Sequence, residues 1–150
     1  TYLTSALLTR TIGQTDINIP LKGSTPFMFE LETGLHFHSG KQDHQELTIG
    51  LMTRTPILEK ISGQTSLGWA NGFSWATENP EWEKGVDGIR GQDTRKFQYY
   101  MGFEINHQPK NWEHIELFAR LHHRSGIYGI ISPSKTGSNY IGAGFRLPLN

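Results

Sequence analysis

A histidine and a serine lie two positions apart in the segment His122-His123-Arg124-Ser125-Gly126. On an extended strand, side chains two positions apart point to the same face, so His123 and Ser125 share one. Asn139 falls on the same face of the next extended segment. Nucleophilic catalysis needs a hydroxyl, a base that takes its proton and a third group that orients the base. The spacing therefore predicts Ser125 as nucleophile, His123 as general base and Asn139 as orienting group.

A nucleophile of this kind also needs N–H donors for the oxyanion that forms on the substrate. The residues directly after the serine are Gly126, Ile127 and Tyr128. We expect their backbone N–H groups to form the oxyanion hole. The alternative is that His123 and Ser125 are only polar anchors where a strand leaves an apolar environment.

Alternation of apolar and polar residues is the dominant pattern of the chain, and it predicts β-strands. In Phe27–His38 one face reads Phe, Phe, Leu, Thr, Leu, Phe, while the other reads Met, Glu, Glu, Gly, His, His. With a less clear first strand, seven strands are expected, at residues 1–12, 27–38, 44–55, 65–77, 97–106, 115–125 and 139–147. Short turns are expected at 39–41, 56–63 and 108–111, with longer connections at 13–26 and 79–94.

Composition agrees with an all-β chain of one domain, residues 1–150. Its 17 glycines would weaken helices by roughly 1 kcal/mol each. No run approaches about 18 apolar residues, so no transmembrane helix is expected. The formal net charge of zero gives no sign of a nucleic-acid partner. The absence of cysteine excludes disulfides, thiolate metal sites and a cysteine nucleophile.

The charged face of these strands is also the glycine and alanine face. Small residues relieve crowding inside a narrow barrel of about eight strands, and they serve little purpose on a solvated exterior. We therefore expect an antiparallel up-and-down transmembrane β-barrel, with apolar stripes toward lipid and a paired charge network in the lumen. That network comprises Glu30, Glu32, Glu46, Arg54, Glu104, Glu116, Arg120 and Arg146. Bacterial barrels have even strand numbers, so a first strand upstream of Thr1 is expected to be missing.

The C-terminal third resembles the outer-membrane lipid A 3-O-deacylases, acyloxyacyl hydrolase-like barrels that cleave an acyl ester of lipopolysaccharide. The resemblance lies in His123-Arg124-Ser125, in Arg120 three residues earlier, and in the ending Phe145-Arg146-Leu147-Pro148. It covers residues 115–149, and the chain as a whole looks closer to an uncharacterised relative group. It implies an integral outer-membrane location, eight strands, lipopolysaccharide as partner and no cofactor.

Two positions depart from that family's pattern. The triad acid is usually a glutamate, whereas Asn139 stands nearest to its place. The asparagine that typically follows the family's serine is Gly126 here. An asparagine can orient an imidazole but cannot offset its positive charge. Loss of one oxyanion donor costs roughly 100- to 1,000-fold in rate.

These departures keep other functions open. One alternative is a non-catalytic barrel, either an envelope scaffold or a subunit of a larger outer-membrane assembly. A weaker one is a soluble lipocalin-like carrier, and a pore through the lumen is weaker still. His36, His38, Asp43 and His44 cluster around one predicted turn and offer ligands for a metal, although a wet loop at the barrel rim is favoured there. We expect an aromatic girdle of Trp69, Trp75, Trp82, Trp112, Tyr99 and Tyr100.

Overall fold

The computed structural model describes residues 1–21, 23–60, 62–83, 94–112, 114–133 and 135–147. Seven strands follow one another along the chain: β1 (Tyr2–Ile19), β2 (Gly23–Ser39), β3 (His44–Lys60), β4 (Gly63–Ala76), β5 (Phe97–Pro109), β6 (Glu116–Ser125) and β7 (Gly137–Arg146). A single 3₁₀ turn, η1 (Ile127–Gly129), lies between β6 and β7.

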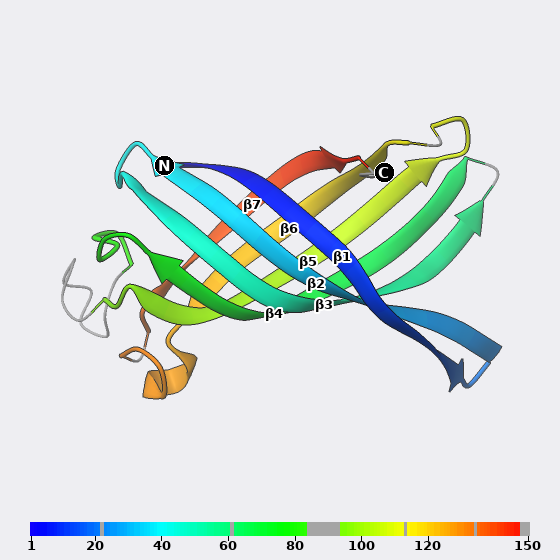
Figure 1. Cartoon of the computed structure of the whole chain (residues 1–150), viewed down its shortest axis with the longest axis horizontal. Helices are drawn as coiled ribbons and strands as arrows, with labels where there is room; N and C mark the ends of the chain where they lie inside the picture. The colour runs from blue at the N-terminus through cyan, green and yellow to red at the C-terminus, as the bar shows by residue number, and fades with distance from the viewer. Residues whose placement is uncertain (22, 61, 84–93, 113, 134, 148–150) are drawn as a thin grey trace.

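The strands form one sheet in which every strand pairs antiparallel with its neighbours in the sequence, in the order β1-β2-β3-β4-β5-β6-β7. The prediction of an all-β, antiparallel up-and-down sheet is therefore confirmed. Among the described residues, no helix is long and apolar enough to cross a bilayer. The connections β2–β3, β4–β5 and β6–β7 lie together at one end of the sheet, here named the loop end (Figure 1).

The expected long connection at 13–26 is wrong. β1 continues to Ile19, and β2 begins at Gly23 and pairs with it throughout. A register shift between Thr11 and Gly13 interrupts the ladder without ending it. The extended hairpin projects past the other strands at the end opposite the loop end (Figure 1). The turn expected at 56–63 is shorter as well, because β3 runs on to Lys60.

The sheet is strongly curled, as side chains on distant strands demonstrate. Arg120 on β6 donates to Glu32 on β2 at 2.5 Å, and His38 on β2 lies 3.2 Å from the Tyr140 hydroxyl on β7. In a flat sheet, strands four or five places apart would be roughly 19 to 24 Å from each other. The edge strands β1 and β7 do not pair, so the described sheet is curled but open. A cavity of about 1010 Å³ lies between them.

The inner face of the curled sheet is polar and the outer face is apolar. Among the residues that the structure describes, only Met52, Ala70 and Tyr100 form a buried hydrophobic cluster. The buried side chains are mostly polar or charged and include Glu32, His36, Glu46, Arg54, Gln98, Glu104, Asn106, Arg120 and Arg124. The large exposed apolar residues include Leu31, Phe37, Leu47, Leu51, Trp69, Phe73, Trp75, Phe103 and Ile105. This is the reverse of a water-soluble sheet, which buries its apolar face.

Ion pairs connect the strands across the inner face. Glu104 is the centre: it contacts Arg54 at 3.1 Å, Arg120 at 2.5 Å and Arg146 at 2.8 Å. Arg54 also pairs with Glu30, and Arg120 with Glu32. Glu116 and Arg146 pair at the half-buried margin of the same face. Charges removed from water are thus offset by opposite charges and hydrogen bonds.

Seven of the eight residues of the predicted network belong to this group of ion pairs. The remaining one, Glu46, belongs to a separate group nearer the loop end. It accepts from His38 at 2.8 Å, from His122 at 3.1 Å and from Ser74 at 2.6 Å. The nearest cation is Arg124, at 3.5 Å. The eight predicted residues therefore share one face but form two groups.

Glycines on the inner face leave room for the polar side chains. A Cβ on Gly34 would lie 2.5 Å from His36 Nε2, and one on Gly102 would lie 2.7 Å from the Tyr100 hydroxyl oxygen. Tyr100 is itself a correction to the predicted aromatic girdle: it is fully buried, and its hydroxyl donates to Glu32 at 2.9 Å. Its even position in β5 gives it the inner face, whereas Tyr99 faces outward.

Candidate active site

The predicted base and orienting group are in contact on the outer face near the loop end. β6 and β7 pair so that His123 lies directly opposite Asn139. The Nδ1 atom of His123 is 2.7 Å from Oδ1 of Asn139. An amide oxygen can only accept, so Nδ1 carries the proton and donates. In the neutral imidazole of this tautomer, Nε2 is the nitrogen that can accept a proton, as a general base requires.

Ser125 shares this face but bonds elsewhere. Its Oγ accepts a hydrogen bond from the backbone N–H of Ile127 at 3.1 Å. Within the described residues, no hydrogen bond joins Ser125 to His123. Their Cα atoms are one full pleat apart, about 7 Å along the strand. The structure thus brings together two members of the predicted triad and leaves the third adjacent.

The backbone after Ser125 has an unusual conformation. Ile127 and Tyr128 have φ values of 47° and 51°, in the left-handed region. For a β-branched residue such as Ile127 this is a genuine outlier that costs about 1–2 kcal/mol. Such strain clusters at functional sites, where the surrounding structure maintains it. Here the tight turn points the Ile127 N–H at the Ser125 hydroxyl, whereas the Gly126 N–H donates to the carbonyl of Thr136 at 3.3 Å.

Gly126 is required by a close approach of the backbone. A Cβ built on it would lie 2.3 Å from the carbonyl oxygen of Ser132 and 2.8 Å from that of Pro133. The β6–β7 connection folds back over this point, and the Gly126 carbonyl accepts from the N–H groups of Ile131 and Ser132. No side chain fits at position 126, so any oxyanion donor here must come from the backbone.

A second cluster, absent from the predicted site, lies directly behind the first. Arg124 alternates with His123 and Ser125, so its side chain points to the inner face, where it is fully buried. It pairs with Glu83 at 2.5 Å and donates to Ser74 at 2.8 Å. Ser138, the neighbour of Asn139, also donates to Glu83, at 2.9 Å.

Glu83 therefore connects the β4–β5 connection to both strands of the site. Its carboxylate is fully buried and also accepts from Gln98 at 2.5 Å. Burial raises the pKa of Glu83, and the Arg124 cation acts in the opposite direction. Alternation alone assigns Arg124 to the inner face, but no pattern in the charged segment 79–94 marks Glu83 as its partner.

The histidines near the β2–β3 turn do not form a metal site. His36, His38 and His44 are buried, and the rings of His38 and His44 stack at 4.1 Å. Asp43 accepts from the Gly40 N–H in the exposed turn. In the part of the chain that the structure describes, no group of three or more histidine, aspartate or glutamate side chains is arranged to hold a metal ion.

No family model, curated protein or solved structure matches this chain. Its function must therefore be inferred from its own side chains. Two features are decisive: a polar inner face beneath an apolar outer face, and the His123–Asn139 contact beside Ser125 on that outer face.

Proposed function

We propose that the chain is a transmembrane β-barrel of the bacterial outer membrane that hydrolyses acyl esters of lipopolysaccharide. Ser125 is the nucleophile, His123 the general base and Asn139 the orienting group. The observation that carries the proposal is the 2.7 Å contact between His123 and Asn139 on an apolar outer face. A lipid ester reaches that face from the bilayer, where a water-soluble substrate would not collect.

The inverted sheet supports the bilayer location. Transmembrane strands alternate between an apolar side toward lipid and a polar side toward the lumen. The ion pairs around Glu104 and the exposed Leu, Phe and Trp stripes fit this pattern. A soluble lipid carrier would have an apolar interior instead, so the carrier alternative is disfavoured.

Closure of the barrel requires partners for both free edges. In lipid, unpaired strand edges are costly because water cannot satisfy their N–H and C=O groups. β1 and β7 run in the same direction, since six antiparallel pairings separate them. One strand antiparallel to both would therefore complete an eight-stranded barrel of even number.

The proposed reaction proceeds in two steps. Ser125 Oγ attacks the ester carbonyl while His123 Nε2 takes the serine proton, and the Ile127 N–H lies beside the attacking oxygen. As the ester C–O bond breaks, the imidazolium gives its proton to the departing sugar oxygen, which leaves as a hydroxyl, and an acyl-serine remains. Water, deprotonated by His123, then releases the fatty acid and restores Ser125. Asn139 holds the ring through Nδ1 but does not neutralise the imidazolium, so a modest rate is expected.

The test uses purified protein in detergent with lipopolysaccharide, and it follows the release of 3-hydroxy fatty acid. Ser125→Ala should abolish release, whereas Ser39→Ala, at the exposed last residue of β2 at the same end, should leave it unchanged. Equal release from wild type and Ser125→Ala would contradict the hydrolase proposal.

A second candidate function is a non-catalytic barrel, as a scaffold or as a subunit of an outer-membrane assembly. It is favoured by the hydrogen bond that holds Ser125 Oγ on the Ile127 N–H rather than on His123. Cross-linking in native membranes should then capture a neighbouring protein. Recovery of a lone monomer together with ester release would count against this candidate.

A further inference from the structure

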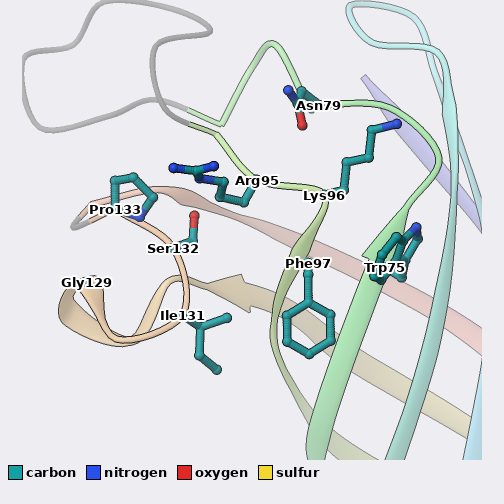
Figure 2. A pocket seen from close by; sticks show the side chains of 9 residues that line it. All are labelled: Trp75, Asn79, Arg95, Lys96, Phe97, Gly129, Ile131, Ser132 and Pro133. Atoms are coloured by element: carbon teal, nitrogen blue, oxygen red, sulfur yellow. The ribbon is translucent and has the colours of Figure 1, made fainter.

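A cavity of about 570 Å³ lies at the loop end, between the β4–β5 and β6–β7 connections. Figure 2 shows its lining: aromatic side chains from the ends of β4 and β5, basic residues just before β5, and Gly129, Ile131, Ser132 and Pro133 from the β6–β7 connection. The residues that matter for binding are Trp75, Phe97, Ile131, Arg95 and Lys96.

One wall of this cavity is apolar and continuous with the outer face. Trp75 on β4 lies opposite Phe97 on β5, and their ring centroids are 6.0 Å apart. Phe73 stacks on Phe97 at 5.3 Å and extends the aromatic surface along the strands. Trp75 is 57% exposed, so an apolar chain can lie against it.

Positive charge lies on both sides of the cavity, with Arg95 beside Ser132 and Pro133 and Lys96 on the side of Trp75 (Figure 2). Arg95 and Lys96 directly precede Phe97, and both are exposed. Lys96 donates to the backbone carbonyl of Thr77 at 2.7 Å, and among the described residues neither side chain forms an ion pair. The nearby carboxylate of Glu83 is already engaged by Arg124. Two cations thus lie at the end of an aromatic surface without a described carboxylate to neutralise them.

We propose that this cavity binds the anionic, phosphate-bearing headgroup of a membrane lipid. Arg95, whose side chain points toward Ser132 and Pro133 (Figure 2), contacts the phosphate, because a guanidinium forms charge-assisted hydrogen bonds with its oxygens. Lys96, whose ammonium is turned toward the end of β4, adds to the positive potential of the cavity. The acyl chain of the same lipid lies along Trp75, Phe97 and Phe73. A free phosphate ion would use the cations but not the aromatic wall, so a lipid fits both features.

This inference rests on the proposed bilayer location and makes the substrate of the proposed hydrolase more specific. Phe97 lies two residues from Tyr99, and Tyr99 pairs with Ser125. Strand geometry then places the Cα atoms of Phe97 and Ser125 about 8 Å apart. A lipid whose phosphate sits at Arg95 therefore presents its first ester linkages near Ser125.

Quenching of tryptophan fluorescence by dibrominated lipids tests the inference independently of catalysis. The protein is reconstituted into phosphatidylcholine vesicles that contain increasing fractions of dibrominated phosphatidylglycerol or dibrominated phosphatidylcholine. The Trp75 signal is the difference between wild type and Trp75→Phe. Phosphatidylglycerol should reach half-maximal quenching at a fraction about tenfold lower, as expected from one or two charge-assisted contacts.

Matched variants test whether the preference for phosphatidylglycerol depends on Arg95 and Lys96. In the double variant Arg95→Gln/Lys96→Gln, both lipids should quench Trp75 fluorescence equally. Lys110→Gln, at the opposite end of the sheet, should retain the preference for phosphatidylglycerol. Gel mobility before and after heating verifies that each variant is folded.

Each other outcome has one meaning. Equal quenching of the wild type by both lipids would overturn the headgroup site, and so would full competition by inorganic phosphate. Absence of any Trp75 quenching would overturn the bilayer location and this site together. Loss of ester hydrolysis with the lipid preference intact would reject only the hydrolase and leave this site standing.

Discussion

At the scale of single residues, the contact between His123 and Asn139 decides which imidazole nitrogen is available as a base. Because the amide oxygen accepts from Nδ1, Nε2 is the nitrogen of the neutral imidazole that can act as base. The asparagine fixes geometry without charge. This difference can be measured by changing the charge at position 139.

Asn139→Asp should increase the rate of ester release by about tenfold. A carboxylate forms a charge-assisted hydrogen bond with the imidazolium that is roughly 1.4 kcal/mol stronger than the neutral bond. Asn139→Ala should reduce the rate by about 100-fold, less than the roughly 10⁴-fold that loss of a charged triad member causes. Both rates are measured as initial velocities at saturating lipopolysaccharide, and an unchanged rate in both variants would remove Asn139 from the mechanism.

Gly126→Ala tests the close backbone approach next to Ser125, the proposed nucleophile. The added methyl group would collide with the Ser132 carbonyl, so the β6–β7 connection must shift. We expect a loss of about 1–3 kcal/mol in the free energy of unfolding, as for overpacked sites, together with loss of ester release. Denaturant unfolding in detergent measures it, with Gly142→Ala as control because a Cβ there meets no atom within 4 Å.

At the scale of elements, β6 contributes side chains to both faces of the sheet because its side chains alternate. His123 and Ser125 point outward, while Arg124 points inward to Glu83 and Ser74. β7 repeats the arrangement with Asn139 outside and Ser138 inside. The inward-facing Arg124 and Ser138 thus bind both strands to Glu83 of the β4–β5 connection. These contacts hold the outward-facing residues of β6 and β7 at a fixed spacing.

Glu83→Gln should destabilise the protein by about 3 kcal/mol, since it leaves the buried Arg124 cation without its closest carboxylate. Glu81→Gln removes the same charge from an exposed position of the same connection and should change stability by less than about 0.5 kcal/mol. The comparison is made by urea unfolding in the same detergent. Equal stabilities of the two variants would show that the Glu83–Arg124 pair does not fasten the connection.

At the scale of the whole molecule, the orientation of the sheet decides the environment. Charged side chains occupy the inner face of the curled sheet, and hydrophobic side chains cover its outer face. Water would penalise that distribution and a bilayer would stabilise it. A pair of substitutions on one strand separates the two environments.

Leu51 and Leu47 both face outward on β3, four residues or about 13 Å apart along the strand. In a bilayer, Leu51→Lys near the middle of β3 should cost about 2–4 kcal/mol and Leu47→Lys near the loop end about 0–1 kcal/mol. In water both substitutions would be close to neutral. Reversible unfolding in lipid vesicles measures the difference, and equal small effects would contradict the membrane assignment.

Much of the fold was predictable because a period of two is a local property. The alternation in Phe27–His38 recurs in five further segments, and each of them became a strand. The predicted inner face is buried along β3, β4 and β5 and at Arg120 and His122 of β6, whereas in β7, at the open edge of the sheet, it is only partly covered. The hairpin over residues 13–26 was not predictable in this way. Residues 10–18 are exposed on both faces, so no burial pattern marks the strand there.

The sequence by itself determined the positions of most strands, their two faces and the shared face of His123, Ser125 and Asn139, since all three depend on side-chain alternation within a strand. Only the tertiary structure decided which groups meet: Asn139 with His123, Ser125 with the Ile127 N–H, and Glu83 with Arg124. These contacts depend on register between strands and on the path of the connections, which alternation within one strand does not encode.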